Sequence, residues 1–323
     1  MSRVDVAEIV ALQRKTANIR NICVLAHIDH GKTTLTDSLI CSNGIISPKL
    51  AGKLRFLDST EDEQQRGITM HASAISLLFR SNQNSTSTSI PLNTNEERSN
   101  SSSSSSDYLI NLIDSPGHID FSSDVSTATR LCDGALIVID VLEGICTQTH
   151  AVVYKALREG LVPVLVLNKI DRLCLELQLT SSEAHAHLRR ILENVNALTY
   201  TLLNSETMSA AAAAPSSSSV PPEEHQPLRS TSEAAVELEE VWNFSPSKGN
   251  VIFASAFDTW GFSLTRFANL WAKKSGLNRN ALQKYLWVSF YLFSSNIYLS
   301  NISFLCLLGR LFFQREHKED CQI

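Results

Sequence analysis

Short apolar runs alternate with helical patterns along most of the chain. Continuous apolar runs at 135–140 and 162–167 predict strands that are covered on both faces, and the run at 21–26 predicts a further strand. Less regular runs predict three more strands, at 74–79, 108–113 and 250–255, and helical periodicity predicts helices at 32–41, 147–159 and 264–272. This alternation predicts an α/β fold with a mostly parallel six-stranded sheet and helices on both faces.

Two polar, low-complexity stretches interrupt this pattern. Residues 81–106 are rich in Ser, Asn and Thr, and residues 205–240 contain an alanine run, a serine run and many acidic side chains. Stretches of this kind bury too little apolar surface to offset the entropy of ordering. We therefore expect two disordered insertions with no function of their own.

The ends of the chain differ from its middle. Residues 1–20 are polar and mixed in charge, without the apolar segment of a secretory signal, and we interpret them as an N-terminal extension. We expect the folded domain at 21–282 and an atypical apolar tail at 283–323. No charged residue lies between Lys284 and Arg310, a run long enough to span a bilayer. Its Ser and Asn residues argue against a membrane partner, although a tail-anchored protein stays an alternative.

Composition narrows the function classes. Hydrophobic residues make up 43% of the chain, enough for a substantial core. The formal net charge of −5 gives no general attraction to nucleic acid, so we expect no direct DNA binding. The seven cysteines contain no C-x-x-C pair, which favours reduced, mostly buried thiols in the cytoplasm.

The first candidate site follows the strand at 21–26 and opens a helix. Backbone N–H groups of such a loop and of the helix N-terminus form a cradle for phosphates. Lys32 would reach the β and γ phosphates, and the Thr33 hydroxyl would bind Mg²⁺. The predicted nucleotide-binding residues of this loop are His27, Ile28, Asp29, His30, Gly31, Lys32, Thr33 and Thr34.

Two further segments carry the chemistry of a γ-phosphate and its metal. Asp114 follows a predicted strand and can hold Mg²⁺. Gly117 can offer its N–H to the γ-phosphate, and His118 beside it is placed to orient an attacking water as the catalytic residue. In the Arg66–Thr69 segment, Thr69 can bind Mg²⁺ through its hydroxyl.

The Asn168-Lys169-Ile170-Asp171 motif follows another predicted strand and selects the base. The Asp171 carboxylate can accept hydrogen bonds from guanine N1–H and the 2-amino group, neither of which adenine offers there. Asn168 can support the base edge, and the Lys169 stem can lie over the ring. After the strand at 250–255, Ser255 and Ala256 can present backbone N–H groups to the guanine oxygen.

Each of these motifs taken alone also fits an ordinary turn or plain packing. Their order is that of a GTPase, and each lies at a strand end or in the loop after the first helix. Ligands bind at the carboxyl ends of parallel strands in open α/β sheets. The sequence therefore predicts a P-loop NTPase G domain that binds GTP and GDP with Mg²⁺ and hydrolyses GTP.

The motifs also carry a family resemblance over 21–282. The run AHIDHGKTTLTDSLI at 26–40 resembles the phosphate loop of translational GTPases, in which alanine is common at the first position. The runs LAGKLRFLDSTEDEQQRGITM, NKIDRLCLEL and ASAFDTWGFSL are most similar to the elongation factor two-like GTPases of large ribosomal subunit maturation.

The resemblance implies more than the residues themselves. It implies a cytoplasmic GTPase that releases an anti-association factor from the large ribosomal subunit, with hydrolysis stimulated by the ribosome. It also implies a monovalent cation bound at Asp29 and a catalytic His118. The resemblance also implies a family that continues into further domains, which we do not expect in these 323 residues, so the open alternative is a truncated GTP-binding module without ribosome-stimulated catalysis.

Overall fold

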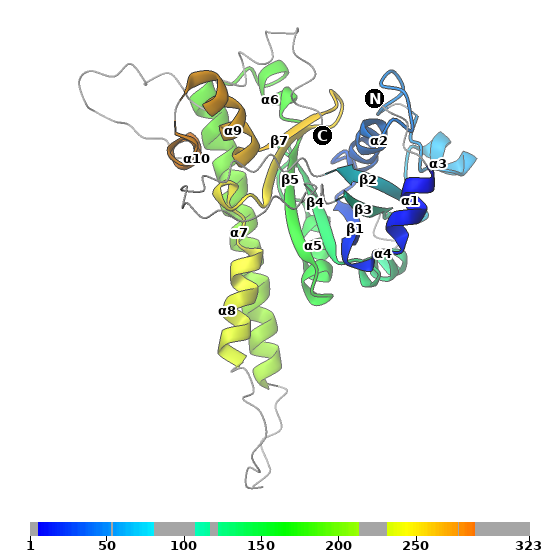
Figure 1. The fold of residues 1–323 in the computed structure, drawn as a ribbon. Helices are drawn as coiled ribbons and strands as arrows, with labels where there is room; N and C mark the ends of the chain where they lie inside the picture. Colours follow the sequence, from blue (N-terminus) through cyan, green and yellow to red (C-terminus); the bar gives the residue numbers. More distant parts are fainter. Residues whose placement is uncertain are drawn as a thin grey trace, which may run out of the picture.

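One sheet forms the centre of the computed structural model, which describes residues 6–52, 54–80, 107–116, 122–212, 231–276 and 278–287. Its strand order is β2-β3-β1-β4-β5-β6-β7 (Figure 1). The strands are β1 (Ile19–Ala26), β2 (Ser73–Arg80), β3 (Asp107–Asp114), β4 (Gly134–Asp140), β5 (Val162–Asn168), β6 (Val251–Ser255) and β7 (Trp260–Ser263).

The middle of the sheet is parallel and its two edges are antiparallel. β3, β1, β4, β5 and β6 run in the same direction, whereas β2 pairs antiparallel with β3, and β7 with β6. The predicted α/β class and mostly parallel sheet are confirmed, but the prediction of six strands was wrong. β7 has four residues, and its stability depends on pairing with β6, where Phe262 stacks on Phe253 at 5.8 Å.

Alternate residues of the central strands contribute to two separate apolar cores. Val24, Val138 and Val166 face one core, whereas Leu25, Ile137 and Leu165 face the other. Burial on both faces explains why these strands are continuous apolar runs in the sequence. Helix α2 (Lys32–Ser42) contributes to the first core, and α5 (Thr147–Arg158), α7 (Ser181–Ala212) and α9 (Leu264–Ser275) contribute to the second.

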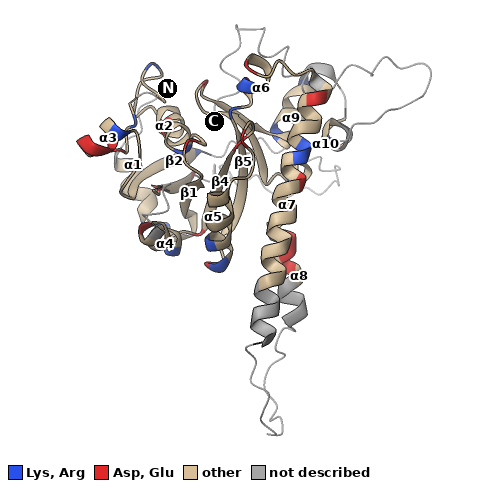
Figure 2. Ribbon diagram, turned by 180° about the vertical axis from the view of Figure 1, so that it is seen from behind, with Lys and Arg blue, Asp and Glu red and all other residues tan. Residues whose placement is uncertain are grey.

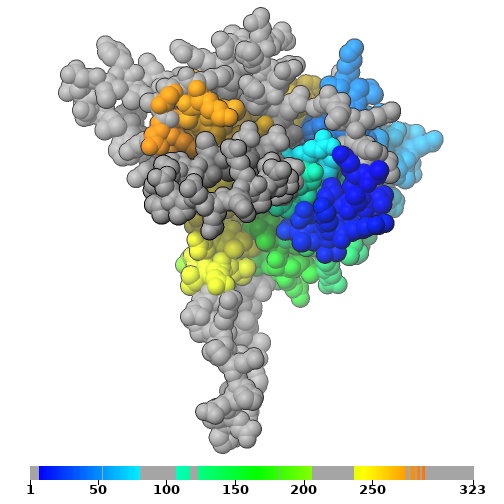
Figure 3. Space-filling model, in the orientation of Figure 1, coloured from blue at the N-terminus to red at the C-terminus, as the bar shows by residue number. Residues whose placement is uncertain are grey.

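Part of the expected N-terminal extension packs on the domain. Helix α1 (Val6–Gln13) lies beside the β2–β3 edge, as the blue and cyan surfaces in Figure 3 show. Glu8 pairs with Arg80 at 2.7 Å, and β1 itself already begins at Ile19. The shorter helices are α3 (Glu61–Arg66), α4 (Ser122–Arg130) and α6 (Asp171–Leu175), with 3-10 turns at Thr16–Asn18 and Pro246–Lys248.

A helical hairpin occupies part of the second expected insertion. Helix α7 continues to Ala212, and α8 (Thr231–Trp242) returns beside it, so that the pair projects away from the sheet (Figures 1 and 2). The prediction of disorder across 205–240 was therefore wrong at both ends, because alanine-rich sequence is also strongly helix-forming. The Asn196 amide exchanges two 2.9 Å hydrogen bonds with the Phe244 backbone near the base of the hairpin. Residues 81–106 and 213–230 lie outside the described residues.

Helix α10 (Arg279–Trp287) crosses the expected boundary at 282. Trp287 packs 5.7 Å from Phe253, and its carbonyl accepts a hydrogen bond from His185 at 3.0 Å. The start of the apolar tail thus belongs to the core. The rest of the tail, 288–323, lies outside the described residues, and none of the helices that are described combines the length and apolarity needed to cross a bilayer.

Candidate functional site

The candidate site residues gather at one edge of the sheet because five parallel strands end there. Ala26, Asp114, Asp140, Asn168 and Ser255 are the last residues of β1, β3, β4, β5 and β6. The strands are in matching register, so that Asp140 lies opposite Asn168 and Asp114 lies opposite Val24. The carboxyl edge of a parallel sheet is where such folds bind ligands.

The loop between β1 and α2 forms a backbone cradle. Asp29 has a positive φ of 63°, and Gly31 has a φ of 87° at the N-cap of α2, where no side chain caps the helix. A Cβ atom at Gly31 would lie 2.4 Å from Asn168 Nδ2, so only glycine fits. The uncapped N–H groups at the start of α2 suit an anion.

Lys32 and Asp114 form a buried ion pair under this loop. Lys32 Nζ lies 2.8 Å from Asp114 Oδ1, and both residues are buried. Burial raises the pKa of the Asp114 carboxyl, and the neighbouring Lys32 charge opposes that rise. Asp114 Oδ2 is buried with no hydrogen-bond partner among the described residues. This unused oxygen is available to a cation or to a water bound to one.

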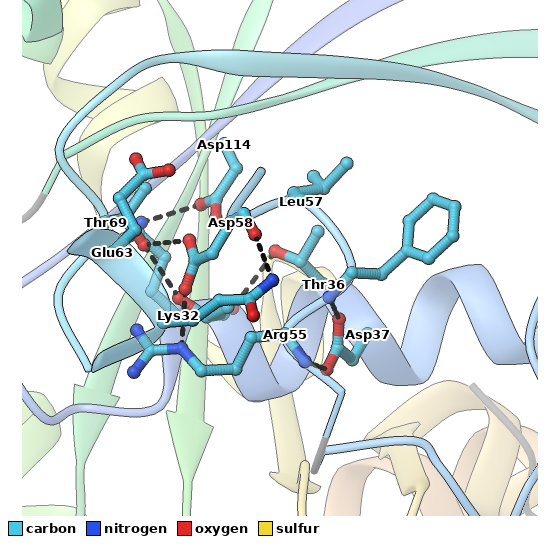
Figure 4. Close-up of polar contacts among 12 residues, drawn as sticks. Lys32, Thr36, Asp37, Arg55, Leu57, Asp58, Glu63, Thr69 and Asp114 are labelled. Atoms are coloured by element: carbon cyan, nitrogen blue, oxygen red, sulfur yellow. Dashed lines mark hydrogen bonds and ion pairs between the residues drawn. The ribbon is translucent and has the colours of Figure 1, made fainter. Parts of the chain in front are cut away.

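Two threonine hydroxyls meet beside the ion pair. Thr33 Oγ1 lies 3.1 Å from Thr69 Oγ1, although Thr33 is in the first turn of α2 and Thr69 is in the segment between α3 and β2. Thr69 donates to Asp58 Oδ1 at 2.9 Å, and Asp58 in turn pairs with Arg55. Figure 4 shows Lys32, Asp58, Thr69 and Asp114 lying together. The two hydroxyls and the Asp114 carboxylate are the oxygen donors that Mg²⁺ prefers.

Glu63 positions the segment that carries Thr69. Its carboxylate accepts hydrogen bonds from the backbone N–H groups of Met70 and His71, each at 2.9 Å, and from Thr60 in a capping box at the start of α3. Burial alone would raise the pKa of Glu63, but the hydrogen bonds from His71, Met70 and Thr60 outweigh it and lower this pKa to about 2. The Glu63 carboxylate is therefore ionised at neutral pH and holds Thr69 in place.

The phosphate loop and the Thr69 segment enclose a pocket of about 420 Å³. We refer to it as the phosphate pocket. Most of the predicted phosphate-binding residues line it, together with Arg55 and Asp37, which the sequence did not single out. Its lining residues are His27, Ile28, Asp29, Gly31, Lys32, Thr33, Thr34, Asp37, Gly52, Arg55, Gly67, Ile68, Thr69 and Lys169.

A second pocket, of about 300 Å³, adjoins the first, and we refer to it as the base pocket. The two share Gly31, Thr34 and Lys169. Asp171 lines the base pocket, and its Oδ1 atom is buried with no hydrogen-bond partner among the described residues. Burial raises the pKa of Asp171, which the nearby Ser255 hydroxyl partly offsets. The base pocket is lined by Gly31, Thr34, Asn168, Lys169, Asp171, Arg172, Leu175, Glu176, Ala256 and Phe257.

Asn168 connects the two pockets through backbone contacts. Its Nδ2 donates to the His30 carbonyl at 2.9 Å, and its Oδ1 accepts from Ala256 N–H at 3.0 Å. Asn168 thus ties the phosphate loop to the end of β6. The Ala256 N–H is engaged by Asn168 in this structure, which differs from the expectation that it faces the base. In the neighbouring residue, the Ser255 hydroxyl donates a hydrogen bond to Asp258 Oδ2 at 3.2 Å.

Lys169 is held across the boundary of the two pockets. Its φ is 63°, and its Nζ lies 2.7 Å from Asp140 Oδ2 at the end of β4. Sequence reasoning missed Asp140, although an acid closing a buried strand is the same signal that singled out Asp114. It also missed Asp58 and Glu63. Gly117 and His118, predicted to act on the γ-phosphate, lie outside the described residues.

The chain is similar to a known family of GTP-binding domains and to several longer proteins. The model of the elongation factor Tu GTP binding domain family matches residues 17–295. Elongation factor-like GTPase 1 of Mus musculus is 50% identical to this chain, in an alignment that covers 90% of this chain and 24% of the mouse protein. The Homo sapiens protein of the same name is also 50% identical, and its alignment covers 88% of this chain and 24% of the human protein. Ribosome assembly protein 1 of Saccharomyces cerevisiae is 46% identical over 90% of this chain and 24% of its own length. The chain therefore spans about a quarter of the length of these relatives.

Proposed function

The chain belongs to the elongation factor Tu GTP-binding domain family, and from this premise we propose that it binds GTP and GDP through the residues described above and hydrolyses GTP. One observation carries the proposal. The carboxylate oxygen of Asp171, which has no hydrogen-bond partner within the described part of the chain, and the cationic Lys32 line two adjoining pockets that share Gly31, Thr34 and Lys169. A guanosine phosphate could bridge the two pockets, because its base can donate hydrogen bonds to Asp171 and its phosphates can pair with Lys32.

The base pocket supports selection of guanine over adenine. Guanine N1–H and the 2-amino group donate to the Asp171 carboxylate, whereas adenine would leave this buried oxygen unpaired. The Lys169 stem, held by its ion pair with Asp140, would cover one face of the base. The Asn168 contacts keep the phosphate loop and the end of β6 at a constant separation, so that the base pocket is preformed.

The phosphate pocket supports binding of the phosphates and Mg²⁺. The N–H groups of the loop and of the start of α2 would bind the β-phosphate, and Lys32 would exchange part of its contact with Asp114 for phosphate oxygens. The hydroxyls of Thr33 and Thr69 and the Asp114 Oδ2 oxygen would hold Mg²⁺. When bound, Mg²⁺ supplies neutralisation of the charge on the phosphate oxygens. Asp29, also in this loop, would help to bind a monovalent cation.

His118 would orient the attacking water, with Gly117 N–H as the partner of the γ-phosphate. The chain segment supports this role because His118 follows Asp114 by four residues, and Asp114 pairs with Lys32, which lines the phosphate pocket. We expect His118→Ala to retain GTP binding and to lose stimulated turnover. Loss of nucleotide binding in this variant would assign His118 a structural role instead.

The relatives support a role in ribosome assembly. One of them is named for that process and two are named as elongation factor-like GTPases. We propose that the GTPase cycle of this domain acts in the cytoplasmic maturation of the large ribosomal subunit, by release of an anti-association factor. The large subunit would then be the partner that stimulates hydrolysis.

A second candidate function is a GTP-binding module without ribosome-stimulated catalysis. It is favoured by the family match, which covers 17–295 and describes a GTP-binding domain alone. GTP turnover measured with and without purified large subunits separates the two. Stimulated turnover supports the ribosome-linked GTPase, and turnover that stays at the basal rate supports the module.

Nucleotide competition tests the core of the proposal. Purified full-length chain would be saturated with fluorescent GDP and challenged with GTP, GDP or ATP. We expect GTP and GDP to displace the probe and ATP to fail at a roughly 1,000-fold higher concentration, because adenine leaves Asp171 unpaired. Displacement by ATP at the concentration at which GTP acts would overturn the proposed guanine site.

A further inference from the structure

A cluster of metal-binding side chains lies between the phosphate loop and the connection from β4 to α5. His27 and His30 come from the phosphate loop, and Glu143 and Cys146 come from the connection. One ligand atom from each of the four residues lies within 4.8 Å of those of the other three. The cluster uses none of the residues that would hold Mg²⁺.

The separations match the edges of a tetrahedral metal site. His30 Nε2 lies 3.3 Å from Glu143 Oε2 and 3.7 Å from Cys146 Sγ, and the sulfur lies 4.0 Å from the carboxylate oxygen. Around a tetrahedral Zn²⁺ with ordinary bond lengths, such ligand atoms are separated by about 3.4–3.7 Å. The ligand atoms of His30, Glu143 and Cys146 would therefore need to move by only a few tenths of an ångström to enclose an ion, and the His27 ligand atom lies within 4.8 Å of each of them.

Hydrogen bonds hold both histidines in the tautomer that a metal needs. His30 Nδ1 lies 3.3 Å from the Val138 carbonyl, which can only accept, so Nδ1 carries the proton and, in the neutral ring, Nε2 carries a lone pair. His27 Nδ1 donates in the same way to Gln148 Oε1, an oxygen that also accepts from Ile28 N–H. Histidines that bind metals are almost always oriented by a second-shell acceptor on the other ring nitrogen.

This tautomer creates an electrostatic conflict inside the cluster. The His30 Nε2 lone pair faces the Glu143 carboxylate at 3.3 Å, so two electron-rich atoms point at each other. Such a pair is stabilised by a positive centre between its members, either a proton on Nε2 or a metal ion. A divalent ion provides such a centre, and with one thiolate and one carboxylate as ligands its two positive charges are balanced.

We propose that His27, His30, Glu143 and Cys146 form a binding site for Zn²⁺, or for another divalent metal that favours nitrogen and sulfur, beside the phosphate loop. The ligand set selects Zn²⁺ over Mg²⁺, because thiolate and imidazole suit the former and all-oxygen sites suit the latter. Binding displaces the Cys146 thiol proton to solvent and forms the metal–sulfur bond, with no change in oxidation state.

The site would connect the metal to nucleotide binding. His27 lines the phosphate pocket and His30 precedes Gly31, so a metal held by both would fix the phosphate loop to the β4–α5 connection. Any change that the metal makes in GDP affinity must be matched by an equal change that GDP makes in metal affinity.

Cobalt substitution tests the site on the full-length chain without nucleotide, so the result does not depend on the proposed GTPase function. We expect Co²⁺ to bind at one equivalent, with a thiolate-to-cobalt absorption band and the strong visible bands of tetrahedral cobalt, and Zn²⁺ to abolish both. Cys146→Ser should remove the thiolate band. The matched control Cys174→Ser, at an exposed cysteine, should retain it.

Two further variants keep the proposal falsifiable if Cys146→Ser does not fold. Glu143→Gln changes an exposed ligand and should weaken Co²⁺ binding at least about 10-fold, and Gln148→Ala removes the partner of His27 and should weaken it roughly 10–100-fold. The absence of a thiolate band in wild type, or its persistence in folded Cys146→Ser, would overturn the site. Unchanged Co²⁺ affinity in Glu143→Gln would equally count against it.

Discussion

The phosphate pocket and the base pocket lie side by side, but they differ in how far their charges are already paired within the protein. In the phosphate pocket, Lys32 is bound to Asp114 at 2.8 Å, and Thr69 is bound to Asp58. In the base pocket, Asp171 keeps a buried oxygen with no partner among the described residues. Lys32 must exchange contacts when a nucleotide binds, whereas Asp171 needs only to receive a donor.

Because of this difference, we expect mutations in the two pockets to change different quantities, namely the free energy of unfolding and the affinity for nucleotide. A residue paired within the protein contributes to folding as well as to binding, because its removal leaves a buried partner uncompensated. A residue whose partner is supplied by the ligand contributes mainly to binding. The phosphate pocket should therefore be sensitive to mutation in stability measurements, and the base pocket in affinity measurements.

The largest expected effect is that of Lys32→Ala on stability. This change leaves the Asp114 carboxylate buried without its cation, which costs about 3–5 kcal/mol when one member of a buried pair is removed. Chemical denaturation of the nucleotide-free protein measures it. Asp171→Ala is the matched control from the base pocket and should cost well under half as much. Equal losses in the two variants would break the distinction between the pockets.

The next largest effect should be on affinity alone. Asp171→Asn replaces an acceptor with an amide that suits the 2-carbonyl of xanthine, so GDP affinity should fall about 100-fold and xanthosine diphosphate should become the better ligand. Unfolding of the apo protein should be almost unchanged. A variant that still prefers GDP would show that Asp171 does not read the base.

Glu63→Gln should have an intermediate effect on stability, of about 2 kcal/mol at pH 7, because hydrogen bonds to a charged acceptor are lost. The pKa of Glu63 lies near 2, below its ordinary value of 4.5. Its stabilising contribution is therefore complete above about pH 4.5 and is lost as the pH falls towards 2. The stability difference between wild type and the variant should shrink over that window. Glu61→Gln, an exposed change on the same helix, should show no such trend.

The smallest expected effect is that of a surface ion pair that lines neither pocket. Arg189 and Glu193 form an exposed pair one turn apart on α7, at 2.8 Å. Arg189→Ala should change the free energy of unfolding by less than about 0.5 kcal/mol and leave GDP affinity unaltered. A larger loss of GDP affinity would mean that the α7–α8 hairpin communicates with the site.

Much of the sheet could be predicted because its strands carry a local signal. β4 and β5 are unbroken apolar runs, and both were located to within one residue at each end. β7 was missed because four residues hold little information until β6 provides hydrogen bonds and Phe253 provides a stacking partner. Helix α7 was not predicted at all, and the alanine run at its end was read as low complexity, although such a run fits a helix equally well.

Site residues could likewise be predicted from the sequence where their signal is local, but not where their role depends on contacts with distant residues. Gly31, Lys32 and Asp171 could be singled out because their residue types suit a known chemistry at the end of a strand. Asp58 and Glu63 could not, because an acidic residue in a polar loop looks like a solvated one. Only the structure shows that both are buried and hold the Thr69 segment through hydrogen bonds.

The sequence by itself determined the class of fold, the order of the motifs and the chemical types available to a guanine nucleotide, because apolar periodicity and turn residues act over a few neighbouring positions. The tertiary structure decided which groups meet. Lys32 and Asp114 are 82 positions apart, and His30 and Cys146 are 116 apart. Strand order and register bring them to one edge of the sheet, and burial there decides which charges are paired and which await a ligand.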